Sequence, residues 1–183
     1  MEQMFLEAYS EKNKFLICRF GNVTHSHGSV LPFWLRLRKE NKPLKLTSKD
    51  MTRLMFSRES AVTLVNDLLI KSEKATEPFI LSKKMPTVHL YKLAKLISES
   101  IEDIGLRPGE KLYEVLISKE ELPYTYLEDD HILIKSNKNT EKNILDEPYS
   151  SETAHEMSEK DMIDMISETD HSLKKSLIDK AIY

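Results

Sequence analysis

The sequence predicts a globular fold of the α/β or α+β class, because short apolar runs typical of strands alternate with stretches of helical periodicity. The chain has 183 residues, of which 40% are hydrophobic and 31% are charged. This composition is typical of globular domains, and it excludes disordered and fibrous proteins. A chain of this length is long enough to bury a hydrophobic core.

Four short segments have the character of strands. Residues 14–20 contain the continuous apolar run Phe15-Leu16-Ile17-Cys18, which is the pattern of a strand buried on both faces of a sheet. The segments 21–29 and 136–150 are polar and are expected to be loops. In chain order, the expected strands are residues 14–20, 44–46, 78–81 and 131–134.

Helices are expected between these strands. Residues 2–9 resemble the end of a helix, and Pro32 suits the first turn of the next one. Ser57 and Thr87 each precede an apolar stripe of helical spacing, so both are expected to be N-caps. The first stripe comprises Ala61, Leu64, Val65, Leu68 and Leu69, and the second comprises Leu90, Leu93, Ala94 and Ile97.

The second half of the chain is expected to be richer in helix than the first. One helix should follow the turn at residues 107–110, with Leu112, Val115 and Leu116 facing inward. Ser158 and Asp161 have the spacing of a capping box, which marks another helix start. A last amphipathic stripe comprises Leu173, Leu177, Ile178 and Ala181.

The charge of the chain is distributed unevenly. The net charge is −3, but residues 1–90 contain 15 Lys and Arg against 9 Asp and Glu, and residues 91–183 contain 12 against 21. A basic half can meet an anionic ligand. Its excess of charge is too small, and its arginines are too scattered, to indicate nucleic-acid binding.

Cysteine, glycine and apolar patterns exclude several classes of protein. The apolar runs are too short to cross a bilayer and no signal peptide opens the sequence, so we expect a cytoplasmic protein without a membrane span. A single cysteine, Cys18, excludes an internal disulfide and a zinc site built only of cysteines. The four glycines do not have the spacing of a dinucleotide-binding fingerprint or a P-loop.

Two polar pairs invite a catalytic or metal-binding interpretation, but another interpretation is preferred for each. Tyr91 and Lys95 have the spacing of a Tyr-x-x-x-Lys proton relay. However, Tyr91 borders an apolar stripe, and no cofactor-binding glycines precede it. His25 and His27 are close in a loop, but two ligands do not make a metal site. We expect them to be solvated or near a ligand phosphate, and Cys18 to be a buried structural thiol.

The segment Arg107-Pro108-Gly109-Glu110 is more informative. Proline and glycine predict a tight turn, and side chains of opposite charge flank it. An arginine can hydrogen-bond two oxygens of a phosphate, and a carboxylate can accept from two neighbouring hydroxyls. A capped turn with a surface ion pair explains the same residues, and both interpretations stay open on the residues alone.

Several segments, in order along the chain, resemble the motifs of one protein family. The most specific segment, GLRPGEKLYEVLI at residues 105–117, is similar to the motif GxRPGEKLHEVLI. RFGNVTHSHGSVLP at residues 19–32 is similar to RYGNVxGSRGSVIP. The family with these motifs is that of the CapD-like nucleotide-sugar 4,6-dehydratases (UDP-N-acetylglucosamine 4,6-dehydratase/5-epimerase type), which are extended short-chain dehydrogenase/reductases of polysaccharide biosynthesis. Further similar segments, at residues 51–56, 84–87, 149–153 and 157–166, extend the resemblance over about residues 2–166.

The resemblance implies an α/β fold, namely the C-terminal portion of an extended short-chain dehydrogenase. It would comprise the last sheet strands, a small α/β substrate-binding domain and a helix-rich acidic tail. We expect residues 1–135 to form the incomplete Rossmann part with the substrate-binding subdomain, and residues 136–183 to form a C-terminal arm. In the family, the NAD(P)-binding glycines, a catalytic Asp/Lys pair and the Tyr-x-x-x-Lys helix all precede the position of Glu2. Tyr91 and Lys95 are therefore not the family's relay.

By the same resemblance, four residues bind the substrate, a UDP-sugar. Asn22 would contact the sugar diphosphate. Arg53 and Arg107 would lie on the pyrophosphate or the uridine ribose, and Glu110 would accept from the ribose hydroxyls. The resemblance implies no catalytic, cofactor-binding or metal-binding residue in this chain.

Two histidines depart from the family's pattern in the segment 19–32. His25 and His27 stand where the family has a glycine and an arginine. A bulky residue thus replaces a permissive one, and an imidazole that can titrate replaces a fixed cation. We therefore expect the phosphate affinity of the site to depend on pH.

Two functions follow as hypotheses. The leading one is the UDP-sugar-binding portion of an NAD(P)-dependent lyase, truncated so that it lacks the cofactor-binding and catalytic half and is inactive by itself. Its partner would then be the missing N-terminal half or a homologous subunit. The alternative is a stand-alone, non-enzymatic module that binds nucleotide sugars or pairs with an enzyme. An unrelated α+β fold is the third possibility.

Overall fold

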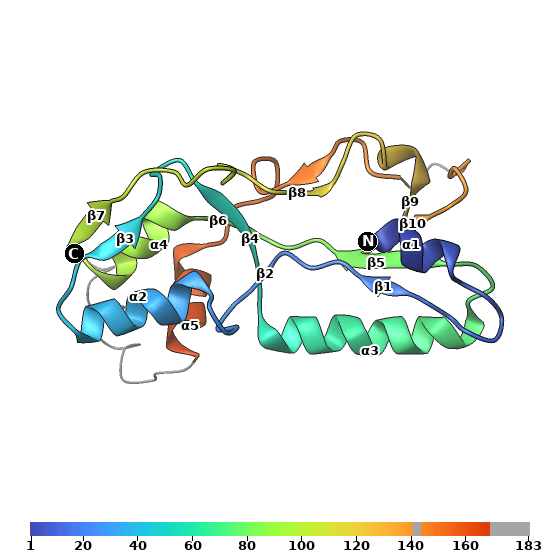
Figure 1. Ribbon diagram of the computed structural model, residues 1–183, viewed down its shortest axis with the longest axis horizontal. Helices are drawn as coiled ribbons and strands as arrows, with labels where there is room; N and C mark the ends of the chain where they lie inside the picture. Colours follow the sequence, from blue (N-terminus) through green and yellow to red (C-terminus); the bar gives the residue numbers. More distant parts are fainter. Residues whose placement is uncertain (141–143, 169–183) are drawn as a thin grey trace.

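The computed structural model describes residues 1–140 and 144–168, and it has the mixed α/β architecture that the sequence predicts. The molecule is elongated, with a four-stranded sheet and a long helix at one end and three helices around a short parallel strand pair at the other (Figure 1). Strands β2 and β4 connect the two ends.

The end that contains the N-terminus is built on a sheet of strand order β1-β5-β10-β9. The edge strand β1 (Ile17–Cys18) pairs in parallel with β5 (Phe79–Lys83), and β10 (His131–Lys135) pairs antiparallel with both β5 and β9 (Thr125–Glu128). Helix α3 (Arg58–Lys74) packs along β1 and β5. Helix α1 (Glu2–Glu7) and the 3-10 turn η1 (Leu122–Tyr124) flank the same sheet.

The opposite end contains α2 (Val30–Lys39), α4 (Leu90–Ile97) and α5 (Glu159–Ser167). Between them, β3 (Leu44–Leu46) pairs in parallel with β7 (Ile101–Asp103). Helix α4 buries four of its eight residues, at the spacing that the sequence predicts for its inner face. Ser158 caps α5 by accepting from the backbone N–H of Asp161 at 3.1 Å, as expected from the capping-box spacing.

A three-stranded sheet of order β2-β4-β6 joins the two ends. Strand β2 (Asn22–Val23) runs parallel to β4 (Thr52–Phe56), and β6 (Thr87–His89) runs antiparallel to it. A second pair, β8 (Val115–Ile117) and β11 (Tyr149–Ser150), crosses above the four-stranded sheet (Figure 1). Side chains alternate along β4, so its two faces supply two different cores.

The hydrophobic core is divided into two clusters. The cleft-side cluster lies between α2, α4, α5 and β3, and the sheet-side cluster lies between α3 and the four-stranded sheet. Met51 and Met55 belong to the first cluster, whereas Leu54 and Phe56 belong to the second. The fully buried members of the two clusters include Trp34, Leu44, Leu46, Leu93, Ile97, Leu64, Leu81, Ile117 and Ile132.

Several expected elements differ in the structure. The strand expected at residues 14–20 contains only two paired residues, and it is a half-buried edge strand rather than one buried on both faces. The expected loop 21–29 contains β2, and β4 was not expected from its pattern. The helix expected after residue 110 is wrong. That segment is irregular until β8, which pairs antiparallel with β11, and Val115, expected to face inward, is exposed.

Two helix predictions need partial correction. Ser57 caps α3 as expected, because its Oγ accepts from the N–H of Ser60 at 3.0 Å. Of the stripe expected to be buried on α3, however, only Leu64 is fully buried, and Val65 and Leu69 are exposed. Helix α4 begins after His89, because Thr87 is part of β6 and uses its backbone N–H and C=O with residues 155 and 157.

The second half of the described chain is not dominated by helix. Residues 101–150 contain the five strands β7 to β11, and α5 is the one helix of the described part of the acidic tail. The stripe at Leu173, Leu177, Ile178 and Ala181 lies outside the described residues. Met162, Ile163, Met165 and Ile166 of α5 pack into the cleft-side cluster, so this part of the tail contributes to the core beneath the cleft.

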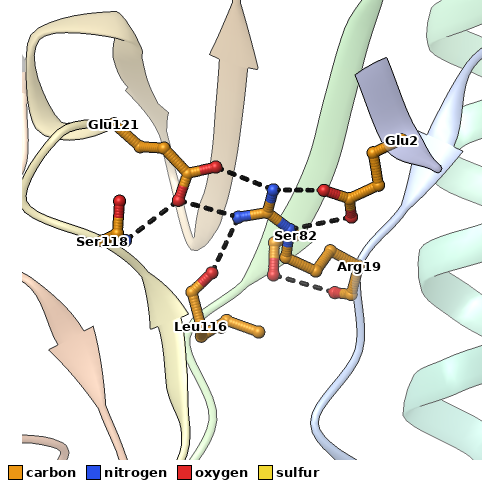
Figure 2. Close-up of polar contacts among 6 residues, drawn as sticks. All are labelled: Glu2, Arg19, Ser82, Leu116, Ser118 and Glu121. Carbon is orange, nitrogen blue, oxygen red and sulfur yellow. Dashed lines mark hydrogen bonds and ion pairs between the residues drawn. The ribbon is translucent and has the colours of Figure 1, made fainter. Parts of the chain in front are cut away.

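A half-buried arginine ties three segments of the sheet end together (Figure 2). Both Arg19 Nε and Nη2 donate to Glu2, at 3.0 and 2.6 Å, and Nη1 and Nη2 donate to Glu121 at 3.1 and 2.8 Å. Nη1 also donates to the carbonyl of Leu116 at 2.8 Å, and Ser82 Oγ donates to the Arg19 carbonyl. Burial lowers the pKa of Arg19, but the two carboxylates outweigh it and raise the pKa overall.

Candidate functional site

A cleft of about 780 Å³ lies at the cleft-side cluster, where β2, β4, α2, β3 and the 104–110 segment meet. Its wall is partly apolar, with contributions from Phe33, Trp34, Met51, Met55 and Leu93. The four residues expected to bind substrate, Asn22, Arg53, Arg107 and Glu110, all line it. The structure thus brings together side chains from three segments that are far apart in the sequence.

Strand pairing explains why Asn22 and Arg53 face the same cleft. Asn22 on β2 lies opposite Met55 on β4, and Arg53 is two residues before Met55. Because side chains of a strand alternate between two faces, Arg53 and Met55 point to one side, together with Asn22. Leu54 and Phe56 point the other way, into the sheet-side cluster.

Arg53 is held by the protein at two of its three guanidinium nitrogens. Nη1 donates to the carbonyl of Thr52 at 2.7 Å and to that of Leu112 at 3.3 Å, and Nε lies 3.3 Å from Glu114 Oε1. Within the described residues, Nη2 makes no hydrogen bond. The N–H groups of Nη2 therefore remain available for an anionic group in the cleft.

Asn22 also contacts Glu114. With its amide oriented so that nitrogen faces the neighbouring acceptors, Asn22 Nδ2 donates to the carbonyl of Leu54 at 3.2 Å and to Glu114 Oε2 at 2.8 Å. The other orientation would place the amide oxygen against two acceptors, which is unfavourable. Glu114 therefore uses one carboxylate oxygen for Asn22 and the other for Arg53.

The turn expected at residues 107–110 is present. Gly109 has φ +80°, which is the conformation that the third residue of a Pro-Gly turn requires. The N–H of Glu110 donates to the Arg107 carbonyl at 3.0 Å, and the N–H of Arg107 donates to Glu110 Oε2 at 3.2 Å. Among the described residues, no carboxylate is within ion-pair distance of the exposed Arg107 guanidinium. The turn is capped as the structural interpretation predicts, and its arginine still lines the cleft.

The two loop histidines have different surroundings. His25 has a positive φ of 54°, and its side chain is 3% exposed, with Nε2 2.9 Å from the Met165 carbonyl of α5. His27 is exposed and lines the cleft. Of the two, His27 can therefore meet a ligand phosphate, whereas His25 joins the loop to α5. Burial raises the pKa of Glu168, 3.9 Å from His25, and the imidazole only partly opposes this.

Two hydroxyl groups in the same loop are buried without a hydrogen bond. Thr24 Oγ1 and Ser29 Oγ have no hydrogen-bond partner in the described part of the chain, and both residues line the cleft. Ser29 is the N-cap of α2, but its side chain makes no cap hydrogen bond. A buried polar group without a partner is costly, so a ligand that hydrogen-bonds these hydroxyls would gain affinity.

The other sequence candidates lie outside the cleft or have structural roles. Tyr91 packs against the cleft-side cluster and Lys95 forms an ion pair with Glu99, so this pair is structural. Cys18 is half-buried, and burial raises its pKa, which disfavours the thiolate. Within residues 1–140 and 144–168, His, Cys, Asp and Glu do not form a group that could hold a metal.

Sequence reasoning did not single out three residues that the structure places at the site. Glu114 was part of the quoted segment 105–117, but its role became visible only through its contacts with two other segments. Thr24 and Ser29 look like ordinary loop residues in the sequence. Their missing hydrogen bonds depend on tertiary packing, which no local pattern predicts.

Comparison with known proteins gives consistent similarities. A family model described as polysaccharide biosynthesis protein matches residues 1–136. The chain is 35% identical over 122 residues to UDP-N-acetylglucosamine 4,6-dehydratase (inverting) of Campylobacter jejuni, and 37% identical over 118 residues to UDP-glucose 4-epimerase of Rickettsia bellii. These matches cover 65% and 61% of the chain. An uncharacterized membrane protein of Methanocaldococcus jannaschii is 42% identical over 124 residues, or 61% of the chain.

A solved structure supports the fold. The X-ray structure of Pen from Bacillus thuringiensis is similar over 100% of this chain, with a TM-score of 0.76 and 26% sequence identity. The match covers 56% of Pen, and the curated matches cover 34–36% of those relatives. The chain therefore spans about a third of the length of the curated relatives. None of the described helices is both long and apolar enough to cross a membrane.

Proposed function

Because this chain belongs to the polysaccharide biosynthesis protein family, we propose that it is the nucleotide-sugar-binding part of a sugar-nucleotide dehydratase or epimerase. The proposed ligand is a UDP-sugar, and UDP-N-acetylglucosamine is the first one to test. Two of the relatives named above, the dehydratase and the epimerase, have descriptions that name UDP-linked sugars. The expected binding residues are Asn22, Arg53, Arg107 and Glu110.

The observation that carries this proposal is the convergence of two arginines and one carboxylate on a single, partly apolar cleft. Two guanidinium groups can neutralise a diphosphate, because each presents paired N–H donors to phosphate oxygens. Glu110 lies on the same turn as Arg107, so its carboxylate is available to the ribose hydroxyls beside that diphosphate. The apolar wall at Phe33 and Trp34 suits the flat faces of a base or sugar.

The residues of this chain do not fit a dinucleotide cofactor. In the family that the sequence resembles, NAD(P) carries the redox step. Here, Gly28, Gly105 and Gly109 have positive φ in separate turns. Gly21 is packed so closely against Leu54 and Met85 that an added Cβ would lie within 3.0 Å of both. These glycines have packing or turn roles, so we assign no oxidation, proton transfer or elimination to this chain.

Isothermal titration calorimetry with UDP-N-acetylglucosamine and UDP tests the binding proposal, with UMP as the control ligand. We expect saturable binding of the two diphosphates and weaker binding of UMP. Arg107→Ala should weaken diphosphate binding about tenfold or more, because it removes a charge-assisted contact. Arg58→Ala, which removes an exposed arginine outside the cleft, is the matched control. If millimolar UDP-N-acetylglucosamine produces no saturable heat, the proposed function is wrong.

The second part of the proposal concerns activity. We expect the pure chain, incubated with UDP-N-acetylglucosamine and NADP, to form no 4-keto sugar. The physical reason is that no described residue of the cleft is placed as a base or nucleophile beside a redox cofactor. Product formation above a no-protein control, followed by mass spectrometry, would contradict this.

An exposed apolar stripe favours a second candidate function, pairing with another α/β unit. On α3, Leu69 and Ile70 are 60% and 67% exposed, and Val62 and Val65 are also exposed. The neighbouring strand β1 is the edge of a parallel pair, and such edges and stripes are normally covered. Sedimentation of wild type and Leu69→Lys tests this. Self-association or aggregation that the substitution abolishes supports pairing through α3, and a monomeric wild type contradicts it.

A further inference from the structure

The side-chain amide of Asn22, a residue that lines the main cleft, has one polar atom without a hydrogen bond to the described residues. Both of its N–H donors are used by the protein, one by the Leu54 carbonyl and one by Glu114 Oε2. Within the described residues, Oδ1 accepts no hydrogen bond. An amide has two donors and one acceptor oxygen, so an Asn22 held in this way offers a ligand only an acceptor.

Glu114 and the Leu54 carbonyl together determine this orientation. Its carboxylate accepts from Asn22 at 2.8 Å through Oε2 and lies 3.3 Å from Arg53 Nε through Oε1. A carboxylate is acceptor-only, so it must face the nitrogen of Asn22 and cannot face the oxygen. Glu114 itself borders a smaller cleft of about 360 Å³ that meets the main cleft at Gly21 and Asn22.

The backbone of Glu114 is fixed by a buried serine. The Glu114 N–H donates to Ser151 Oγ at 2.9 Å, and the Ser151 N–H donates to the Glu114 carbonyl at 2.8 Å. Ser151 is almost fully buried, and its Oγ is 2.9 Å from Thr52 Oγ1. Thr87 Oγ1 donates to the Ser151 carbonyl at 2.6 Å. The Glu114 carboxylate therefore projects from a rigid backbone anchored to β4 and β6, the sheet that carries Arg53.

We propose that Glu114 is a positioning residue that makes Asn22 a hydrogen-bond acceptor, so that Asn22 selects the hexose of the ligand and does not bind its diphosphate. Phosphate oxygens are acceptors and cannot bond to Asn22 Oδ1. The hydroxyl and amide N–H groups of an N-acetylated hexose are donors and can. This inference rests on the proposed function, which places the diphosphate between Arg53 and Arg107, and it changes the role that the family resemblance implies for Asn22.

The substitution Glu114→Gln tests whether Glu114 orients the Asn22 amide or only supports the local structure. Arg53 Nε is a charged donor and would retain the Gln oxygen, which turns the Gln NH2 toward Asn22. Asn22 would then face one acceptor, the Leu54 carbonyl, and one donor, the Gln NH2, so neither orientation of its amide satisfies both neighbours. The variant keeps the size of the side chain but releases Asn22 from its fixed acceptor orientation.

The first test compares a ligand that contains the hexose with one that lacks it. In calorimetric titrations we expect Asn22→Ala and Glu114→Gln each to weaken UDP-N-acetylglucosamine binding about tenfold. UDP, which lacks the hexose, should bind within twofold of wild type in both variants. The double variant should be no weaker than Asn22→Ala alone, because Glu114 acts through Asn22. Equal losses for the two ligands, or additive effects, would overturn the proposal, since a merely structural role weakens both ligands alike. Glu152→Gln, which removes an exposed carboxylate nearby, is the matched control.

A second test does not require any ligand. The Asn22 side-chain amide is assigned in nitrogen–proton spectra of the free chain as the pair of signals that Asn22→Ala removes. We expect Glu114→Gln to shift this pair and to speed its exchange with solvent, and Glu152→Gln to leave it unchanged. An unshifted pair would overturn the role of Glu114. If this test succeeds but wild type binds neither nucleotide, the proposed function and the choice of hexose fail together, while the orientation of Asn22 stands.

Discussion

The two hydrophobic clusters of this protein differ in how completely they are covered. In the cleft-side cluster, α2, α4 and α5 all bury their apolar faces, and Trp34 is 1% exposed. In the sheet-side cluster, the 17-residue α3 has only Leu64 fully buried, and its outer apolar side chains face solvent. The edge strand β1 of the same sheet is also unpaired on one side within the described residues. Among the described residues, the end that holds the candidate site thus covers its own core, and the sheet end leaves apolar side chains of α3 exposed.

This difference fits different roles for the two ends, ligand binding at one and association with another surface at the other. A binding cleft needs fixed side chains, and a complete core beneath it provides them. An uncovered apolar helix and a sheet edge are instead the features of a surface that another α/β layer normally covers.

The largest expected effect on stability comes from comparing substitutions of two large apolar side chains, one at each end of the molecule. We expect Trp34→Ala to lower the free energy of unfolding by about 3–5 kcal/mol, because it removes a fully buried indole and leaves a cavity. The indole Nε1 also donates to the Lys45 carbonyl at 2.9 Å. Leu69→Ala should change the same quantity by less than about 0.5 kcal/mol. Urea unfolding followed by circular dichroism measures both, and similar losses would show that α3 is covered in solution.

The Arg19 cluster should be the main polar contribution to the sheet end. We expect Arg19→Met to lower the free energy of unfolding by about 2–4 kcal/mol, because two carboxylates and the Leu116 carbonyl lose their shared donor. Lys42→Gln is the control, since its ion pair with Glu40 is exposed to solvent and should contribute little to stability. Equal effects in chemical denaturation would contradict the assigned role of Arg19.

Acid should weaken the same cluster. Burial tends to raise the pKa of Glu121, but hydrogen bonds from Arg19 and from the Ser118 N–H outweigh it and lower the pKa below the ordinary 4.5. A carboxyl with a lowered folded pKa stabilises the protein above its unfolded pKa, and that contribution is lost as the pH falls.

Denaturation of wild type and Glu121→Gln at several pH values measures this contribution. We expect the variant to be about 1–2 kcal/mol less stable at pH 7, because it loses the charged hydrogen bonds to Arg19. The difference should shrink as the pH falls below about 4.5, where wild type also loses the carboxylate. A difference that is constant between pH 7 and pH 3 would show that Glu121 contributes through packing alone.

The sequence predicted the parts of the fold that depend on local patterns. Helix α4 with Leu90, Leu93 and Ala94 inward, the Ser57 and Ser158 caps, and the strands at β3, β5 and β10 are confirmed. Each follows from periodicity or from a side-chain–backbone hydrogen bond within one segment. The helix expected over residues 110–117 is absent: Leu112, Val115 and Leu116 have a helical spacing, but pairing with β11 decides the conformation of residues 115–117.

In the candidate site too, the sequence identified residues that lie in recognisable segments but missed those that depend on tertiary contacts. The resemblance identified Asn22, Arg53, Arg107 and Glu110, and the structure places all four around one cleft. Glu114 could not be selected in this way, because its two contacts come from strands that lie about 60 and 90 residues earlier in the chain. The buried stripe expected on α3 failed for a related reason, since amphipathicity does not tell whether a covering surface is part of the same chain.

The smallest effect that we expect concerns the cleft loop. His27 lines the cleft and His25 is turned toward α5, so a pH-dependent phosphate contact should come from His27 alone. Histidine gains a positive charge between pH 8 and pH 6, which favours an anionic diphosphate. We expect UDP-N-acetylglucosamine to bind a few-fold more tightly at pH 6 than at pH 8, and His27→Gln to remove the difference. Equal affinity of wild type at both pH values would show that His27 does not reach the diphosphate. A pH dependence that survives in His27→Gln would assign the effect to His25 and its contact with α5.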